Sequence, residues 1–290
     1  MAAPPDPSSA DEIPADPIPA DRLAELDSFL IELNTAAAQA ILPLFRADHG
    51  LEDKGGGEGG GGSGGFDPVT EADKGAERAI RALIAARYPD HGIIGEEYGE
   101  DRPDAEWVWV LDPVDGTRAF IAGLPLWCTL IGLRHNGTPV LGSIGQSFLG
   151  ELYIGHAGGS RLMTRGNSRP LQVRACPALS AALIATTDPA LFVGPEQEAW
   201  QAVRAGARLA RLGCDAYAYA MVAAGTIDLV IETGLKAWDI DAAIPVLAGA
   251  GGFTTDWRGQ PVGAHGGKVA IAGDRACLDA ALVALSLAAG

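Results

Sequence analysis

Basic residues are scarce in this sequence. Its 21 Lys and Arg stand against 37 Asp and Glu, which gives the 290-residue chain a formal net charge of −16. A surface with this balance repels nucleic-acid phosphates and anionic lipids, so we expect neither a nucleic-acid nor a membrane partner. The surplus of carboxylates suggests instead that some of them gather around cations.

Cysteines are also few, and they form neither CxxC nor CxxH pairs: Cys128, Cys176, Cys214 and Cys277. This spacing excludes a typical zinc site and a dense disulfide framework, and it favours a reducing compartment. The N-terminal segment has no basic start and no apolar stretch, and no run of about eighteen apolar residues occurs. The sequence therefore predicts a cytoplasmic protein without a signal peptide or a membrane span.

Two segments have biased composition. Residues 1–20 are rich in Pro, Ala and Asp and offer little to bury, which predicts a disordered tail. Residues 55–65 are mostly glycine, which is typical of a mobile loop. A phosphate-binding loop would require GxxxxGK[ST], whereas FDPVTEAD follows this segment. We therefore predict a mobile loop here.

Apolar periodicity predicts helices before strands in the first half of the chain. Leucines at three- and four-residue steps indicate a helix with Asp21 as its N-cap, which Pro43 should bend or end. A second helix is expected from about Glu71 to Tyr88. Five strand-like segments follow, and Asn136-Gly137 indicates a hairpin between the third and fourth: 91–97, 107–113, 126–134, 139–146 and 151–157.

Helices and strands alternate in the second half, which favours parallel pairing. Helices are expected at 196–210, 216–225, 238–251 and 277–288, with strands at 182–187 and 227–233. The whole pattern predicts a layered α/β (α+β) protein with two abutting lobes and a cleft between them. We place the lobes at residues 21–160 and 161–290.

The segment WVWVLDPVDGT carries the clearest chemical signal. A strand of alternating Trp and Val ends at Asp112, and Pro113 and Gly116 then force a turn that brings Asp115 close to Asp112. Two adjacent carboxylates repel each other unless a cation or a shared proton compensates. A simple turn is the competing interpretation, because Asp, Pro and Gly are common turn residues.

Acidic residues also occur at the ends of other predicted elements: Glu96, Glu97, Asp67, Asp73, Glu232, Asp239 and Asp241. Each of them alone is more often a helix cap or a solvated side chain, and Asp67 and Thr70 are good N-cap candidates. Several such clusters together favour binding of a hard cation. Ligation by oxygen alone suits Mg²⁺, which commonly assists hydrolysis of phosphate esters.

The motifs DPVTEAD, GEE, DPVDGT and WDIDAA, in this order, resemble those of the inositol monophosphatase-like, lithium-sensitive phosphatases over residues 21–288. The resemblance implies an α-β-α-β-α sandwich, two or three Mg²⁺ ions, a small phosphomonoester substrate and a homodimer. It also implies that the loop at 55–65 closes over the ions, and that Glu97 has an outer role. The implied metal ligands are Glu96, Asp112, the Val114 carbonyl, Asp115 and Asp239.

The same resemblance implies catalytic roles for Thr117 and Asp73, which would orient and deprotonate the attacking water. The backbone N–H groups of Gly116 and Thr117 would hold the phosphate. The implied substrate-binding residues are Asp115, Gly116, Thr117, Asp215 and Glu232.

Two stretches, GTRAFIAGLPLWCTLIGL and RLGCDAYAYAMVAAGTIDLVIETGLK, are similar to bacterial histidinol-phosphate phosphatases of histidine biosynthesis. Acidic Asp215 and Glu232 suit a substrate that carries an ammonium and an imidazole. Ala237-Trp238, by contrast, is closer to the inositol enzymes. Tyr217 and Tyr219 are more simply explained as a half-buried helix face.

We therefore expect hydrolysis of L-histidinol phosphate. The alternatives are an inositol-1-phosphate phosphatase of broad specificity, a 3′-phosphoadenosine phosphatase, and a non-catalytic cation-binding relative. The histidines of the sequence have no partner pattern, so it does not support a covalent serine or cysteine mechanism.

Overall fold

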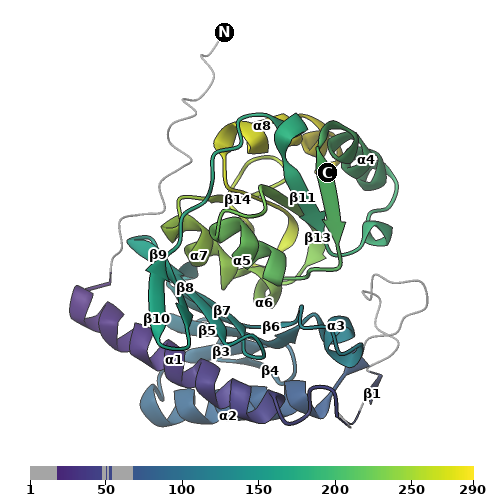
Figure 1. Ribbon diagram of the computed structural model, residues 1–290. Helices are drawn as coiled ribbons and strands as arrows, with labels where there is room; N and C mark the ends of the chain where they lie inside the picture. Colours follow the sequence, from purple (N-terminus) through teal and green to yellow (C-terminus); the bar gives the residue numbers. More distant parts are fainter. Residues whose placement is uncertain (1–17, 48–49, 51, 54–67) are drawn as a thin grey trace.

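The computed structural model describes residues 18–47, 50, 52–53 and 68–290. Its elements form five layers, which are two outer helices, a sheet, a middle layer of helices, a second sheet and two further helices (Figure 1). This is the predicted α-β-α-β-α sandwich. Of the tail predicted for residues 1–20, residues 1–17 lie outside the described residues, as does the predicted loop at 55–65. The prediction was too long at its end, because Ile18 is buried and Ala20 already begins a helix.

The outer helices α1 (Ala20–Ile41) and α2 (Glu71–Arg87) cover one face of the first sheet (Figure 1). The apolar residues that recur along α1 are buried: Leu26, Leu30, Leu33, Ala37 and Ile41. Asp21 is not the N-cap, because α1 begins one residue earlier with Pro19 at that position. Asp21 instead lies in the first turn, where an acid favours the helix dipole. The helix ends before Pro43, as expected.

The first sheet has the order β10-β9-β8-β7-β6-β5-β3-β4. Only β3 and β5 pair in parallel within it. Its strands are β3 (Gly92–Gly95), β4 (Gly99–Asp101), β5 (Trp107–Asp115), β6 (Cys128–His135), β7 (Thr138–Gln146), β8 (Glu151–His156), β9 (Gly159–Thr164) and β10 (Asn167–Pro170). The sheet thus continues beyond residue 160. The short strands β1 (Glu52–Asp53) and β2 (Pro68–Val69) pair with each other.

Asn136 and Gly137 form the two-residue turn between β6 and β7. Both residues have positive φ, 50° and 80°, as a type I′ hairpin requires. The hairpin was therefore predicted correctly.

The second sheet has the order β12-β11-β13-β15-β14 and is mixed. β11 pairs in parallel with β12 and β13, as expected, whereas β15 is antiparallel to both of its neighbours. Its strands are β11 (Leu183–Thr186), β12 (Leu209–Leu212), β13 (Leu229–Leu235), β14 (Phe253–Asp256) and β15 (Gly267–Ala272). Of these, β12 lies in a region predicted to be the end of a helix.

Helices α4 (Pro195–Gly206) and α8 (Arg275–Leu285) cover the outer face of the second sheet, whereas α5 (Tyr217–Ala223), α6 (Ala237–Ile240) and α7 (Ala243–Gly249) form the middle layer. The single helix expected at 238–251 is thus broken into two. A short helix, α3 (Thr117–Ile121), follows β5, and single 3₁₀ turns occupy 179–181, 189–191 and 286–288.

The middle helices approach the first sheet very closely. A Cβ atom on Gly142 of β7 would lie 2.2 Å from the Ala242 carbonyl oxygen, so glycine is needed at this contact. Arg134 of β6 forms a buried ion pair with Asp241, which follows α6 directly. These contacts fix the position of α6 relative to the end of β5. No helix among the described residues is long and apolar enough to cross a membrane.

Candidate active site

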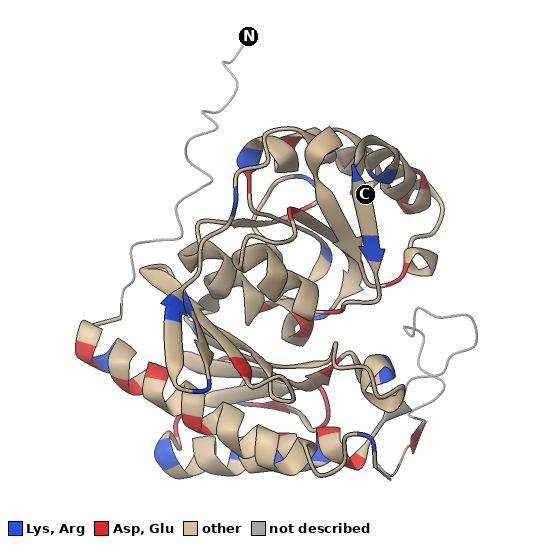
Figure 2. Cartoon of the chain, viewed as in Figure 1, with Lys and Arg blue, Asp and Glu red and all other residues tan. Residues whose placement is uncertain are grey.

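Three carboxylates from two distant segments of the chain meet where the middle layer of helices packs against the first sheet. Ligand oxygens of Asp112, Asp115 and Asp239 all lie within 4.8 Å of one another. Asp112 and Asp115 stand at the end of β5, where an irregularity in the pairing with β6 separates them. Asp239 comes from α6, in the opposite lobe. Figure 2 shows acidic segments where the lobes face each other.

Backbone hydrogen bonds orient all three carboxylates. The Val114 N–H donates to Asp112 Oδ1 over 3.1 Å, and the Lys236 N–H donates to Asp239 Oδ2 over 2.6 Å. Asp115 Oδ2 accepts from the Ala216 N–H over 2.7 Å, which ties the end of β5 to the start of α5. The group is therefore set in place by the folded main chain.

The three carboxylates lie where negative charge is unfavourable. Burial, followed by the charges of Glu96 and Asp115, raises the pKa of Asp112 well above its ordinary value. Burial and the nearby Asp215 do the same to the pKa of Asp115, and burial raises the pKa of Asp239 to about 6. A divalent cation would relieve this cost, and a donor set made only of carboxylate oxygens fits Mg²⁺.

Glu96 lies beside this group rather than within it. It follows β3, and its charge is the largest neighbouring charge that raises the pKa of Asp112. Its N–H donates to the Leu111 carbonyl over 3.2 Å, which keeps the end of β3 next to β5. The parallel pairing of these two strands places Glu96 near Asp112.

Asp73 and Thr117 face each other beside the three carboxylates. The Thr117 hydroxyl oxygen is 3.5 Å from Asp73 Oδ1 and 3.1 Å from the Val114 carbonyl oxygen. The other oxygen of Asp73 accepts from the Thr70 N–H over 2.8 Å, within a capping box at the start of α2. Asp73 thus serves as a helix cap on one side while it faces Thr117 on the other.

Asp215 packs against the turn that follows β5. Its backbone has a φ of 45°, which is uncommon for a residue other than glycine. A Cβ atom on Gly116 would lie 3.2 Å from the Asp215 carboxyl carbon, so the two residues are in close contact. Burial raises the pKa of Asp215 to about 6.

Glu232 lies in β13 and is held by two threonines at the end of β11, Thr186 as its last residue and Thr187 directly after it. The Thr187 N–H and hydroxyl donate to its Oε1 over 2.8 and 3.0 Å, and the Thr186 hydroxyl donates to its Oε2 over 3.3 Å. Burial raises the pKa of Glu232 to about 8. Neither threonine was among the residues predicted from the sequence. They could have been found, because parallel strands end side by side. The pair Thr186-Thr187 ends one predicted strand, and Glu232 lies near the end of the other.

The two tyrosines of α5 differ in their surroundings. Tyr217 is half-buried, and its hydroxyl donates to Glu151 over 2.8 Å, whereas Tyr219 is buried in the core. Their packing agrees with the helix-face interpretation.

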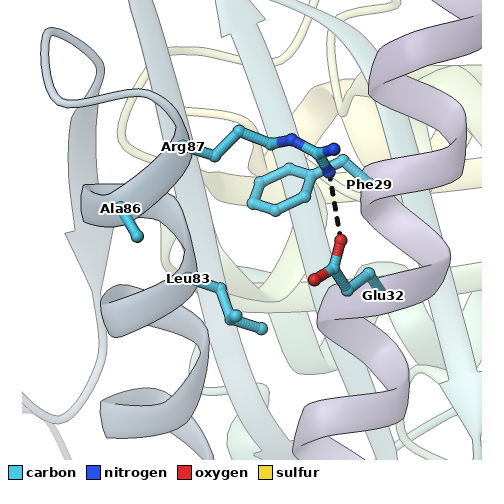
Figure 3. Close-up of a pocket in the computed structure, with 5 residues that line it drawn as sticks. All are labelled: Phe29, Glu32, Leu83, Ala86 and Arg87. Atoms are coloured by element: carbon cyan, nitrogen blue, oxygen red, sulfur yellow. Dashed lines mark hydrogen bonds and ion pairs between the residues drawn. The ribbon is translucent and has the colours of Figure 1, made fainter.

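A separate hollow of about 290 Å³ lies between the outer helices α1 and α2, and none of Asp112, Asp115 and Asp239 lines it (Figure 3). Phe29 and Leu83 line it beside the Glu32–Arg87 ion pair of 3.0 Å. None of the predicted site residues lines it.

A layered fold with convergent carboxylates suits a hydrolase that uses divalent cations. Comparison with known proteins narrows this class. Residues 22–287 match the inositol monophosphatase family. A histidinol-phosphatase of Chlorobaculum parvum is 38% identical over 194 residues, which are 67% of this chain and 74% of the relative.

Two further similarities support the assignment. The chloroplastic bifunctional phosphatase IMPL2 of Arabidopsis thaliana is 41% identical over 242 residues, 83% of this chain but 66% of the relative, so the chain spans slightly less than two thirds of that protein. A solved inositol monophosphatase of Zymomonas mobilis is 37% identical with a TM-score of 0.79, covering 91% of this chain and 98% of that one. The chain belongs to the inositol monophosphatase family, whose members are metal-dependent phosphomonoester hydrolases.

Proposed function

We propose that the protein is a Mg²⁺-dependent phosphomonoesterase that hydrolyses L-histidinol phosphate to L-histidinol and phosphate. The observation that carries the hydrolytic part is the meeting of Asp112, Asp115 and Asp239 within 4.8 Å of one another, next to the Asp73–Thr117 pair. A purely cation-binding relative would have no need for a hydroxyl and a carboxylate placed beside the carboxylate group.

The residues that would hold Mg²⁺ are Glu96, Asp112, the Val114 carbonyl, Asp115 and Asp239. Bound Mg²⁺ would lower the pKa of a water molecule and stabilise negative charge on the phosphate and the leaving oxygen. Two or three ions remain the prediction from the family resemblance.

Side-chain and main-chain groups of the protein would transfer the proton and hold the phosphate. Asp73 accepts a proton through the Thr117 hydroxyl, because its Oδ1 faces that hydroxyl. The main-chain N–H groups of Gly116 and Thr117 bind the phosphate oxygens. Hydrolysis then needs no phosphoenzyme.

The acidic character of the leaving-group side supports a cationic substrate. Asp215 lies against Gly116, beside the proposed phosphate-binding turn, and Glu232 is held in place by Thr186 and Thr187. Their raised pKa values show that burial disfavours two negative charges here. An ammonium or imidazolium group would compensate these charges, whereas the neutral hydroxyls of inositol would not.

Inositol 1-phosphate is the second candidate. The similarity to the Zymomonas mobilis inositol monophosphatase over nearly its whole length favours it, as does Trp238 before Asp239. Comparing kcat/KM for both esters in the same Mg²⁺ buffer tests the choice. We expect histidinol phosphate to be preferred at least about tenfold, a difference of about 1.4 kcal/mol in transition-state binding. A preference for inositol phosphate would overturn the substrate assignment while leaving the phosphatase assignment intact.

Asp215→Asn is the matched variant for this comparison. It removes the negative charge and keeps the shape of the side chain. It should lower kcat/KM for histidinol phosphate more than for inositol phosphate. An equal loss with both esters would show that Asp215 does not select a cationic leaving group.

A cytoplasmic location and a homodimer belong to the same proposal. The homodimer is implied by the family resemblance alone, and sedimentation of the purified chain tests it. The Arabidopsis relative is chloroplastic, so location in the native cell needs its own measurement.

A further inference from the structure

Glu77 is a buried carboxylate that none of the roles above uses. It lies on α2 four residues after Asp73, so the two side chains share one face of that helix. Its side chain is 0% exposed, and it points toward the turn that links β3 to β4. This turn contains Glu96, one of the proposed metal ligands.

Three donors converge on the Glu77 carboxylate. The Glu97 N–H donates to Oε2 over 2.8 Å, the Tyr98 N–H donates to Oε1 over 3.2 Å, and Arg81 Nε donates to Oε1 over 2.7 Å. Two of these donors are the main-chain amides that directly follow Glu96. Hydrogen bonds to an ionised carboxylate are stronger than neutral ones, so this carboxylate holds the turn firmly.

Gly95, the residue before this turn, packs directly against the Glu77 carboxylate. A Cβ atom on Gly95 would lie 2.0 Å from Glu77 Oε1 and 2.6 Å from its carboxyl carbon. Any larger residue at position 95 would therefore displace Glu77. Arg81 also donates to the Gly99 carbonyl at the start of β4, so the Glu77–Arg81 pair spans the turn.

We propose that Glu77 is a positioning residue that sets the Glu96 carboxylate for Mg²⁺ binding. Glu96 lies between Gly95, which packs against Glu77, and Glu97, whose amide Glu77 binds. The direction of the Glu96 side chain is thereby fixed before a cation arrives. One face of α2 then supplies both Asp73, which faces Thr117, and the support for a metal ligand. This inference rests on the proposed Mg²⁺-dependent function.

The test is Glu77→Gln, compared with Glu32→Gln. The control removes the same charge and also breaks an ion pair with an arginine, but on the exposed α1–α2 surface (Figure 3). In Glu77→Gln the amide group cannot accept from both backbone N–H groups and Arg81 as a carboxylate does. Isothermal titration of Mg²⁺ into each purified protein, without substrate, measures the dissociation constant directly.

We expect Glu77→Gln to weaken Mg²⁺ binding about tenfold, because loss of a group that orients a ligand typically costs 10- to 100-fold in metal affinity. Glu32→Gln should bind Mg²⁺ as the wild type does. Excess Mg²⁺ should restore most of the kcat of Glu77→Gln. A lower melting temperature with unchanged Mg²⁺ affinity would show a merely structural role and overturn the inference.

Arg81→Met provides a second, milder variant should Glu77→Gln not fold. It leaves the Glu77 carboxylate in place and removes one of its three donors, so we expect Mg²⁺ binding to weaken a few-fold. Wild-type affinity in this variant would then count against the inference. A wild-type protein that binds Mg²⁺ but hydrolyses neither ester would refute the proposed function, while the Mg²⁺ titrations would still decide the role of Glu77.

Discussion

At the scale of single residues, burial opposes negative charge on Asp112, Asp115 and Asp239 and raises the pKa of each carboxyl group. Their separate positions along the chain could be found from the sequence, because each lies at the end of a predicted strand, in the turn after it, or at the start of a predicted helix. Their mutual distance could not be found in this way. It depends on how α6 packs against the first sheet, and the spacing of the motifs carries no information about that packing.

Asp115→Asn should abolish Mg²⁺-dependent turnover and leave the fold intact. The asparagine carbonyl can still accept from the Ala216 N–H, and loss of a buried like charge removes a repulsion from Asp215. Since loss of even an outer partner costs about 10- to 100-fold in metal affinity or activity, loss of a ligand should cost more. Turnover in Mg²⁺ and the melting temperature in EDTA measure the two effects.

Asp279→Asn serves as the control for this variant, because Asp279 is exposed and pairs only with the nearby Arg275 in the described contacts. It should match the wild type in both measurements. Substantial turnover in Asp115→Asn would contradict the role of Asp115 as a ligand.

Glu232 should make stability depend on pH in the absence of metal. Burial raises its pKa from 4.5 to about 8, so the folded protein binds a proton that the unfolded chain releases at lower pH. Its stabilising contribution is therefore complete below about pH 4.5 and is lost as the pH rises through 8. In Glu232→Gln, the free energy of unfolding should fall less between pH 5 and pH 9 than in the wild type.

Urea unfolding in EDTA at several pH values measures this difference. The exposed residue Glu198 provides the control, and Glu198→Gln should follow the wild-type pH dependence. Parallel curves for wild type and Glu232→Gln would mean that Glu232 is ionised at no cost in the folded protein.

At the scale of elements, the sequence predicts those with strong local signals. The period of α1, the Trp-Val alternation of β5 and the Asn136-Gly137 turn each specify their structure within a few residues. The break between α6 and α7 and the strand β12 were missed. Both depend on contacts with other elements, since α6 ends where Asp241 meets Arg134, and β12 forms by pairing with β11.

Gly142→Ala should test the close approach of the middle layer. The added methyl group would meet the Ala242 carbonyl oxygen at 2.2 Å, so α6 and α7 would have to shift. We expect a loss of about 1–3 kcal/mol in unfolding free energy, which is typical of overpacking, together with weaker Mg²⁺ binding because Asp239 moves with α6. Urea unfolding measures the change in stability, and titration calorimetry measures the change in Mg²⁺ affinity.

Gly75→Ala provides the matched substitution. Gly75 lies within α2, and the added methyl group would be 3.9 Å from Ala40 Cβ and from Arg78 Nη2. Alanine should therefore stabilise the protein by about 0.5–1 kcal/mol through helix propensity. A stabilising effect of Gly142→Ala would show that the two layers can move apart without cost.

At the scale of the whole molecule, the site exists only where the two lobes meet. Asp112 and Asp115 belong to the first sheet, whereas Asp239, Asp215 and Glu232 belong to the second half of the chain. The sequence predicted two abutting lobes, but it could not specify the contact between them. Arg134 and Asp241 form that contact across 107 positions, and neither stood out as a partner of the other before the fold was known.

The Arg134–Asp241 pair should couple the lobes and thereby hold Asp239 in place. Both side chains are more than 90% buried, and Arg134 Nη2 also donates to the Ala264 carbonyl over 2.7 Å. Removal of one partner leaves the other charge buried without compensation. Arg134→Met or Asp241→Leu alone should therefore cost about 3–5 kcal/mol in unfolding free energy.

The double variant Arg134→Met/Asp241→Leu should recover much of that loss, because an apolar pair of similar volume often replaces a buried ion pair at little cost. A double-mutant cycle of urea unfolding measures the coupling free energy. Losses that simply add would refute a direct interaction. Measuring Mg²⁺ affinity shows whether the ion pair also aligns Asp239, which lies two residues before Asp241. In that case the double variant should regain stability and still bind Mg²⁺ more weakly than the wild type.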